Sequence, residues 1–286
     1  MIIKKGIYLA LLCVCIYNIA QAQYYYQDII NTENMTKEHR QYRENKISHI
    51  RIKSYDDNNE INTNFHCVKE FSDDFKRVIT RTGSFETGNS VVYSDFDDQG
   101  RITRSTDSTA NSVNDTRYYY DKKRPEQIDS LRFISYSIQN ADTFRYNESH
   151  IYEYDSSGKP LKMIRLKNDS PFSVVTFTTN SEGSVIKESE KGRYDTVPAA
   201  YYKYNASGQP TDIFHFNADK QRMVPDFLFD YDPQNRLTEK TTVTMNRNSY
   251  LVWKFFYGDK GLVDKEACYG PKDALLGTMK FEYTSR

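Results

Sequence analysis

The chain has neither long hydrophobic runs nor an excess of charge of one sign. Apolar residues make up 38% of its 286 positions, and the mean hydropathy is −0.78. Lys and Arg total 39, and Asp and Glu also total 39, so the formal charge is zero. A chain this polar excludes a bundle of membrane-spanning helices. The balanced charge does not support binding to nucleic acid, which requires a basic face.

The sequence motifs of common enzymes are also missing. We find no Gly-x-Ser-x-Gly elbow, no phosphate-cradling glycine loop and no dinucleotide fingerprint. The histidines do not show the His-x-x-x-His spacing of a metal site; they are His39, His49, His66, His150 and His215. His215 alternates with Phe214 and Phe216, which predicts a solvated residue on the polar face of a strand.

The remaining polar clusters do not define a site either. Asp56-Asp57 and Asp97-Asp98 could bind calcium, but turn chemistry already accounts for acids at such places. We therefore predict no catalytic, cofactor-binding or metal-binding residues, no cofactor, and a non-enzymatic protein. A hydrolase whose site is scattered over loops is an alternative that sequence patterns do not reveal.

Cysteine is scarce, and the N-terminal sequence indicates export. Residues 1–22 have the form of a secretory signal peptide: Lys4 and Lys5, then an apolar stretch, then Ala20-Gln21-Ala22 before a cut at Gln23. Only two of the four cysteines, Cys67 and Cys268, follow the signal peptide, and their spacing does not fit a metal site. In an oxidising compartment they either form a disulfide that ties the two ends of the chain together or remain separate buried thiols. His66 adjoins Cys67 and so points to the opposite face of a strand, where it cannot serve as its base.

Aromatic residues are abundant and form a repeat. The 24 Tyr and 16 Phe exclude a disordered chain, and many of them recur every 25 to 27 residues. In each unit aromatic and polar residues alternate, and then come Asp or Asn, two polar residues and Gly. The clearest units are Tyr152–Gly158, Tyr202–Gly208, Phe229–Asn235 and Phe255–Gly261, and Phe177–Gly183 is a weaker copy.

This unit predicts a β-hairpin. Alternation with a period of two is typical of a half-buried strand. Asp or Asn begins a turn by accepting a backbone hydrogen bond, and Gly supplies the left-handed conformation that closes it. Phe75 and Arg124 stand where Gly is expected, so we predict that their turns differ. About nine hairpins give an antiparallel meander of about eighteen strands.

The repeat also sets the domain organisation. After the signal peptide, residues 23–46 are a polar N-terminal arm that could be mobile, with a short helix around Thr36–Tyr42. Residues 47–286 form a single β-hairpin repeat domain. Segment 133–149 exceeds the repeat length and predicts an extended loop or an outsized hairpin.

The unit resembles the YD repeats of RHS-type bacterial proteins, with Tyr152–Leu161 and Phe96–Ile102 closest to the pattern. The resemblance covers roughly residues 65–286. It departs from the pattern at Thr179, Asn205 and Gly258. Large RHS proteins wind such strands into a shell around a cargo, and this chain is too short for a large shell. Its size and leader look more like the secreted repeat proteins of Bacteroidetes-type bacteria.

The aromatic face of the strands must be covered, and this leaves three architectures. The all-β sheet can flatten into two layers, curl around a cavity, or close into a β-barrel that crosses a membrane. Charged residues at 27% oppose the membrane-inserted form. Our main interpretation is an exported structural or binding surface with a protein or glycan partner, in the periplasm or outside the cell. The alternative is an outer-membrane β-barrel pore or transporter component. Exposed first and last strands would also allow self-association.

Overall fold

The computed structural model describes residues 24–85, 87–139, 142–192, 199–218, 220–244 and 249–286. The predicted signal peptide, residues 1–22, lies outside the described residues. Among the helices of the described part, none has the length and apolarity needed to span a membrane.

The described residues form one α-helix, α1 (Tyr26–Glu44), then eighteen strands, with one 3-10 turn, η2 (Pro271–Asp273), between the last two strands. All neighbouring strands are antiparallel, as the repeat predicts. The strands are β1 Ile47–Tyr55, β2 His66–Phe71, β3 Arg77–Ser84, β4 Gly88–Phe96, β5 Ile102–Thr109, β6 Ser112–Tyr120, β7 Ile128–Gln139, β8 Asp142–Tyr154, β9 Pro160–Lys167, β10 Ser170–Thr179, β11 Val185–Gly192, β12 Ala200–Tyr204, β13 Pro210–Asn217, β14 Arg222–Tyr231, β15 Leu237–Thr244, β16 Ser249–Tyr257, β17 Val263–Tyr269 and β18 Leu275–Ser285.

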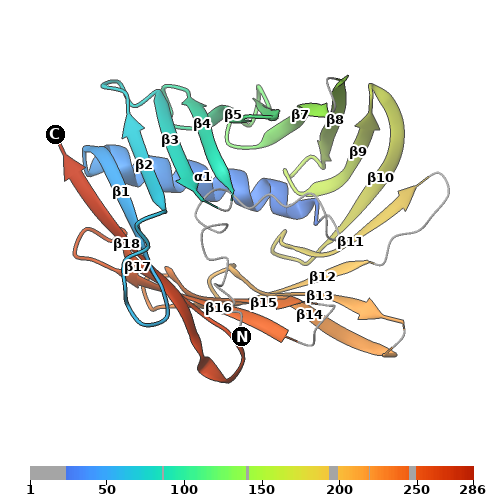
Figure 1. The fold of residues 1–286 in the computed structure, drawn as a ribbon. Helices are drawn as coiled ribbons and strands as arrows, with labels where there is room; N and C mark the ends of the chain where they lie inside the picture. The colour runs from blue at the N-terminus through green and yellow to red at the C-terminus, as the bar shows by residue number, and fades with distance from the viewer. Residues whose placement is uncertain (1–23, 86, 140–141, 193–198, 219, 245–248) are drawn as a thin grey trace.

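The meander closes into a barrel (Figure 1), because β1 pairs with β2 on one side and with β18 on the other. The predicted all-β meander is confirmed, and the closed barrel is the one of its alternative forms that the chain adopts. Segment 133–149 is the outsized hairpin β7–β8, with strands of 12 and 13 residues. Closure also pairs the first and last strands with each other, which removes the exposed edges on which we based the expectation of self-association.

The turns follow the predicted chemistry. Asp155 Oδ1 accepts hydrogen bonds from the backbone N–H groups of Ser157 and Lys159, both at 2.8 Å, and Gly158 has a φ of 89°. The Phe75 and Arg124 turns are longer. The N–H of Ser72 donates to the carbonyl of Arg77, five positions later, and the N–H of Asp121 donates to the carbonyl of Gln127, six positions later. Phe75 itself takes the left-handed conformation, with a φ of 57°.

The structure corrects our expectation that the polar N-terminal arm is mobile. It is the 19-residue helix α1, which lies inside the ring of strands (Figure 1). The short helix expected at Thr36–Tyr42 is the second half of this element. A helix of this length is about 28 Å long, and eighteen strands close a ring about 30 Å across. The lumen of such a barrel is too wide for wall side chains alone to fill, and α1 supplies the missing core.

One face of α1 packs against the aromatic inner wall. Its buried residues follow helical spacing: Ile29, Thr32, Thr36, His39 and Tyr42. The His39 ring stacks on Phe96 with centroids 3.6 Å apart, and Tyr26 contacts Tyr202 edge-on at 5.4 Å. The repeat's aromatic residues thus form the surface on which the helix packs, as well as the core of the sheet.

The two cysteines are free thiols, which decides between the alternatives that the sequence left open. Cys67 lies on β2 and Cys268 on β17, and strands β18 and β1 run between them. Three strand spacings amount to about 14 Å, whereas a disulfide requires Cα atoms within about 7 Å. Both side chains are buried, at 0% and 1% exposure.

Candidate functional site

The largest concentration of buried charge lies where the start of α1 meets β8, β9 and β11. We call it the anchor cluster: Asp28, Glu148, His150, Arg165 and Glu190. The His150 ring bridges helix and wall, with Nδ1 2.6 Å from Asp28 Oδ2 and Nε2 2.8 Å from Glu148 Oε1. Arg165 donates to both oxygens of Glu148, at 2.7 and 3.0 Å, and to Glu190 at 3.2 Å.

Hydroxyl groups complete the anchor cluster. Tyr152 donates to Asp28 at 2.9 Å, and Ser173 donates to Glu190 at 2.5 Å. The Tyr25 hydroxyl donates to the other oxygen of Glu190 at 3.1 Å. Buried charges are tolerated only when they are paired and hydrogen-bonded in this way.

The electrostatics of this cluster favour docking over catalysis. Burial lowers the pKa of His150, but Asp28 and Glu148 outweigh it and raise the pKa to about 9. Burial would raise the pKa of Glu148, yet hydrogen bonds from His150, Arg165 and Tyr146 hold it at about 2. An imidazolium held between two carboxylates has no free basic nitrogen, so it cannot act as a general base. The arrangement locks the helix to the wall.

A second wall carboxylate caps the helix. Glu188 on β11 accepts the backbone N–H of Tyr25 at 3.1 Å and that of Tyr26 at 2.8 Å. These N–H groups belong to the first turn of α1, which has no intrahelical partner for them. Burial raises the pKa of Glu188 to about 8 even though it accepts these bonds.

The structure corrects the prediction for His215. This residue is buried at 8% exposure, with Nδ1 2.6 Å from Asp226 Oδ2, whereas Phe216 is 43% exposed on the outer face. On β13 the inward face carries His215 together with the buried Ile213, and the outward face carries Phe216. The ladder with β14 shifts register between Ile213 and Phe214.

The other sequence candidates have structural roles. Asp97 Oδ1 accepts the N–H groups of Gln99 and Arg101, both at 2.9 Å, as turn chemistry predicts. His66 is exposed and Cys67 is buried, so they do lie on opposite faces. Burial raises the pKa of both thiols, that of Cys268 to about 12. Across the described residues, no group of three His, Cys, Asp or Glu side chains is placed to hold a metal ion.

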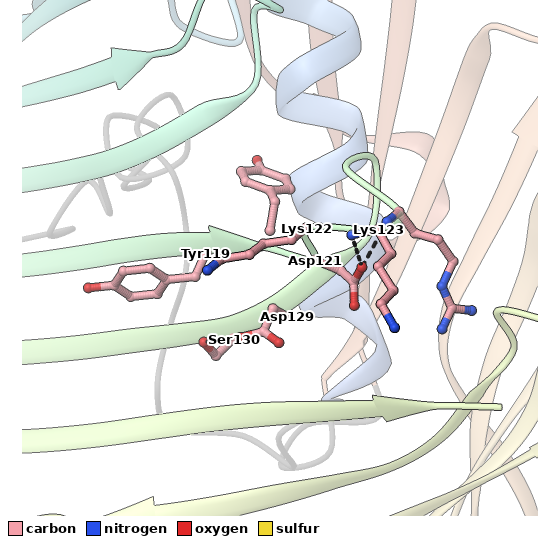
Figure 2. A pocket seen from close by; sticks show the side chains of 8 residues that line it. Tyr119, Asp121, Lys122, Lys123, Asp129 and Ser130 are labelled. Carbon is pink, nitrogen blue, oxygen red and sulfur yellow. Dashed lines mark hydrogen bonds between the residues drawn. The ribbon is translucent and has the colours of Figure 1, made fainter. Parts of the chain in front are cut away.

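The outer surface carries a shallow groove of about 670 Å³ beside the β6–β7 turn (Figure 2). Its lining includes Tyr119, Lys122, Asp129 and Ser130. Asp121 does not offer a free carboxylate there, because it accepts the N–H groups of Lys123 and Arg124 at 2.7 Å. The groove mixes aromatic and charged side chains, and its lining residues form no matched acid–base pair.

Charged pairs cross the outward face between many neighbouring strands. They include Lys53–Glu282 at 2.5 Å between β1 and β18, and Arg77–Asp95 at 2.6 Å between β3 and β4. Further pairs are Glu70–Arg81, Glu153–Lys162, Lys203–Asp212 and Glu239–Lys254. The exterior of the barrel is therefore charged around much of its circumference.

Our sequence reasoning missed the anchor cluster. The signal that could have revealed it is the continuous alternation Glu148-x-His150-x-Tyr152-x-Tyr154, which places an acid and a histidine on the same face as two core tyrosines. The helix partners of these residues could not be identified in this way.

Comparisons with known proteins give little guidance. No protein-family model and no curated protein matches this chain. Among solved structures, a porin-like protein from Bacteroides vulgatus aligns over 73% of this chain and 98% of its own, with 10% identity and a TM-score of 0.33. One from Bacteroides uniformis covers 83% and 98%, with 10% identity and a TM-score of 0.30. A TcdB2-TccC3-TEV structure covers 77% of this chain but 17% of its own, with 10% identity and a TM-score of 0.29. These likenesses are too distant to carry an argument about function.

Proposed function

We propose that this chain is an exported, non-enzymatic β-barrel whose outer wall serves as a structural or binding surface, in the periplasm or outside the cell. The observation that carries the proposal is the set of ion pairs across the outward face. Each Lys or Arg facing the middle of a bilayer costs about 2–4 kcal/mol. Pairs such as Lys53–Glu282 and Lys162–Glu153 lie within the strands, where a lipid-facing barrel needs apolar side chains.

The helix adds a second reason. Helix α1 lies across the lumen and is held by the anchor cluster and by Glu188, so the interior is occupied by the chain itself. A barrel filled by its own segment is suited to presenting its outer wall. The resemblance to YD repeats fits such a role, because in large RHS proteins those repeats form the wall of a shell.

An outer-membrane pore or transporter component is the second candidate. A closed meander with an even number of antiparallel strands favours it, since this is the architecture of bacterial outer-membrane barrels. In that case α1 would act as a plug.

Detergent dependence separates the two functions. We would express residues 23–286 and purify them by size-exclusion chromatography without detergent, then mix the protein with liposomes and float the vesicles. A surface-presenting barrel elutes as one soluble monomeric peak and stays at the bottom of the gradient. Aggregation that detergent cures, together with flotation, would reject our proposal and make conductance the next assay.

A further inference from the structure

An in-register row of lysines crosses the seam where the barrel closes. Lys265 on β17 lies directly opposite Lys280 on β18, and Lys280 lies directly opposite Lys53 on β1. Adjacent strands are about 4.8 Å apart, so the three lysines span about 10 Å. We call this group the lysine row.

In the lysine row, two of the three side chains lack an acidic partner within the part of the chain that the structure describes. A second in-register row, Arg104, Arg117 and Arg132, has its charges paired with Asp115 and Asp169. Like charges directly opposite each other repel across a sheet. Lys53 is neutralised by Glu282, but among the described residues Lys265 and Lys280 form no ion pair. Their positive charge on the exterior is therefore available to an anion.

Aromatic rings lie immediately beside these cations. The Lys265 ammonium lies 3.9 Å from the centroid of Phe256, and that of Lys280 lies 4.4 Å from the centroid of Tyr55. Lys254, on the same outer face, lies 5.4 Å from the centroid of Tyr269. Phe256 remains 41% exposed and Tyr250 remains 37% exposed. A ligand here meets positive charge and apolar ring faces together.

That combination selects one class of polyanion. Sugar rings have apolar C–H faces that pack on aromatic rings, and a uronic acid adds a carboxylate to each ring. Lys265 and Lys280 lie on adjacent strands about 4.8 Å apart, which lets neighbouring residues of a polyuronate each meet a lysine. A nucleic acid is disfavoured, because the whole chain has a formal charge of zero.

We propose that the outer face of β16, β17, β18 and β1 binds an acidic polysaccharide, with Lys265 and Lys280 contacting its carboxylates and the neighbouring aromatic rings packing on its sugars. This inference rests on the proposed function, because the face is accessible only if the barrel wall faces water.

The test is affinity electrophoresis of residues 23–286 in native gels that contain polymannuronate, with dextran gels as the neutral reference. The wild type should be retarded by polymannuronate and not by dextran. The double variant Lys265→Gln/Lys280→Gln should bind at least tenfold more weakly. The control Lys162→Gln/Lys203→Gln removes the same charge from another part of the wall, and its affinity should stay within twofold of the wild type.

Thermal unfolding provides an independent readout. The Tm of Lys265→Gln/Lys280→Gln should stay close to that of the wild type, because relief of like-charge repulsion offsets the loss of two cation–π contacts. A loss of binding at an unchanged Tm cannot be attributed to misfolding. Lys162→Gln/Lys203→Gln loses two ion pairs and should not gain stability.

Three results would overturn the proposal: no retardation of the wild type, equal weakening in both double variants, or equal retardation by polymannuronate, polyphosphate and DNA. The last would mean that charge alone drives binding. A protein that is soluble without detergent but not retarded rejects this inference alone, whereas a detergent-dependent protein rejects the proposed function.

Discussion

The hydroxyl of Tyr257, at the end of β16, donates a 2.8 Å hydrogen bond to the carbonyl oxygen of Leu237, the first residue of β15. The β14–β15 ladder shifts register beside Leu237. The same bond recurs in five other units, always to the first residue of the preceding strand: Tyr120 to Ile102, Tyr154 to Ile128, Tyr204 to Val185, Tyr231 to Pro210, and Tyr283 to Val263. The second tyrosine of the repeat is thus a hydrogen-bonding residue as well as a core residue.

Removing that hydroxyl should therefore destabilise the barrel. Tyr257→Phe keeps the ring and removes the hydrogen bond to the half-buried Leu237 carbonyl, which we expect to cost about 1 kcal/mol in the free energy of unfolding. Urea denaturation measures it. Tyr250→Phe is the control, because Tyr250 is 37% exposed. Equal midpoints for the two variants would show that the bond is not a stabilising part of the repeat.

The anchor cluster predicts a loss of stability at alkaline pH. The pKa of His150 is raised to about 9 from the usual 6.5, so its contribution is complete below pH 6.5 and is lost as the pH rises through 9. By linkage this is on the order of 3 kcal/mol. Glu188, with its pKa raised to about 8, acts in the same direction.

The measurement is the free energy of unfolding at pH 6.5 and pH 9 in the same buffer system. His150→Gln should reduce the decrease between the two values and should be less stable than the wild type at pH 6.5. A wild type that is equally stable at both values, or more stable at pH 9, would contradict the assignment of His150 as a charged anchor.

Glu188 should control how firmly the first turn of α1 is held. Replacing it with Leu removes the carboxylate that accepts the N–H groups of Tyr25 and Tyr26, at a cost of about 1–3 kcal/mol. We expect trypsin to cleave α1 at Lys37, Arg40 or Arg43 several-fold faster than in the wild type. Mass spectrometry of the fragments measures this. Glu153→Leu, on the outer face, is the control, and equal cleavage rates would reject a capping role.

The two thiols should not react with a thiol reagent in the folded protein. Cys67 and Cys268 are buried and their pKa values are raised, so little thiolate is present or accessible. Titration of residues 23–286 with a thiol reagent should find two free thiols after denaturation without reductant and essentially no rapid reaction in the native state. A count of zero in denaturant would mean that the protein holds a disulfide.

The repeat and its turns could be predicted because they depend on neighbouring residues. Alternation in Tyr152-x-Tyr154 marks a strand, and Asp155 with Gly158 closes its turn through bonds that span four positions. The approximate number of hairpins followed from the repeat length alone. The candidate site was not predictable in this way. The partners of Glu188 and His150 on α1 lie more than 120 positions away, and no local pattern links them.

By itself, the sequence determined the hairpins, their order and the chemistry of their turns, because these depend on φ, ψ and hydrogen bonds between near neighbours. The tertiary structure decided the closure of β1 on β18, the separation of the two cysteines and the inward face of His215. It also decided that the polar arm forms a helix inside the barrel. The buried face of α1 consists largely of Thr, His and Tyr, which hydropathy does not mark as a core stripe. Such a helix becomes stable only when the wide lumen offers aromatic rings and paired charges to receive it.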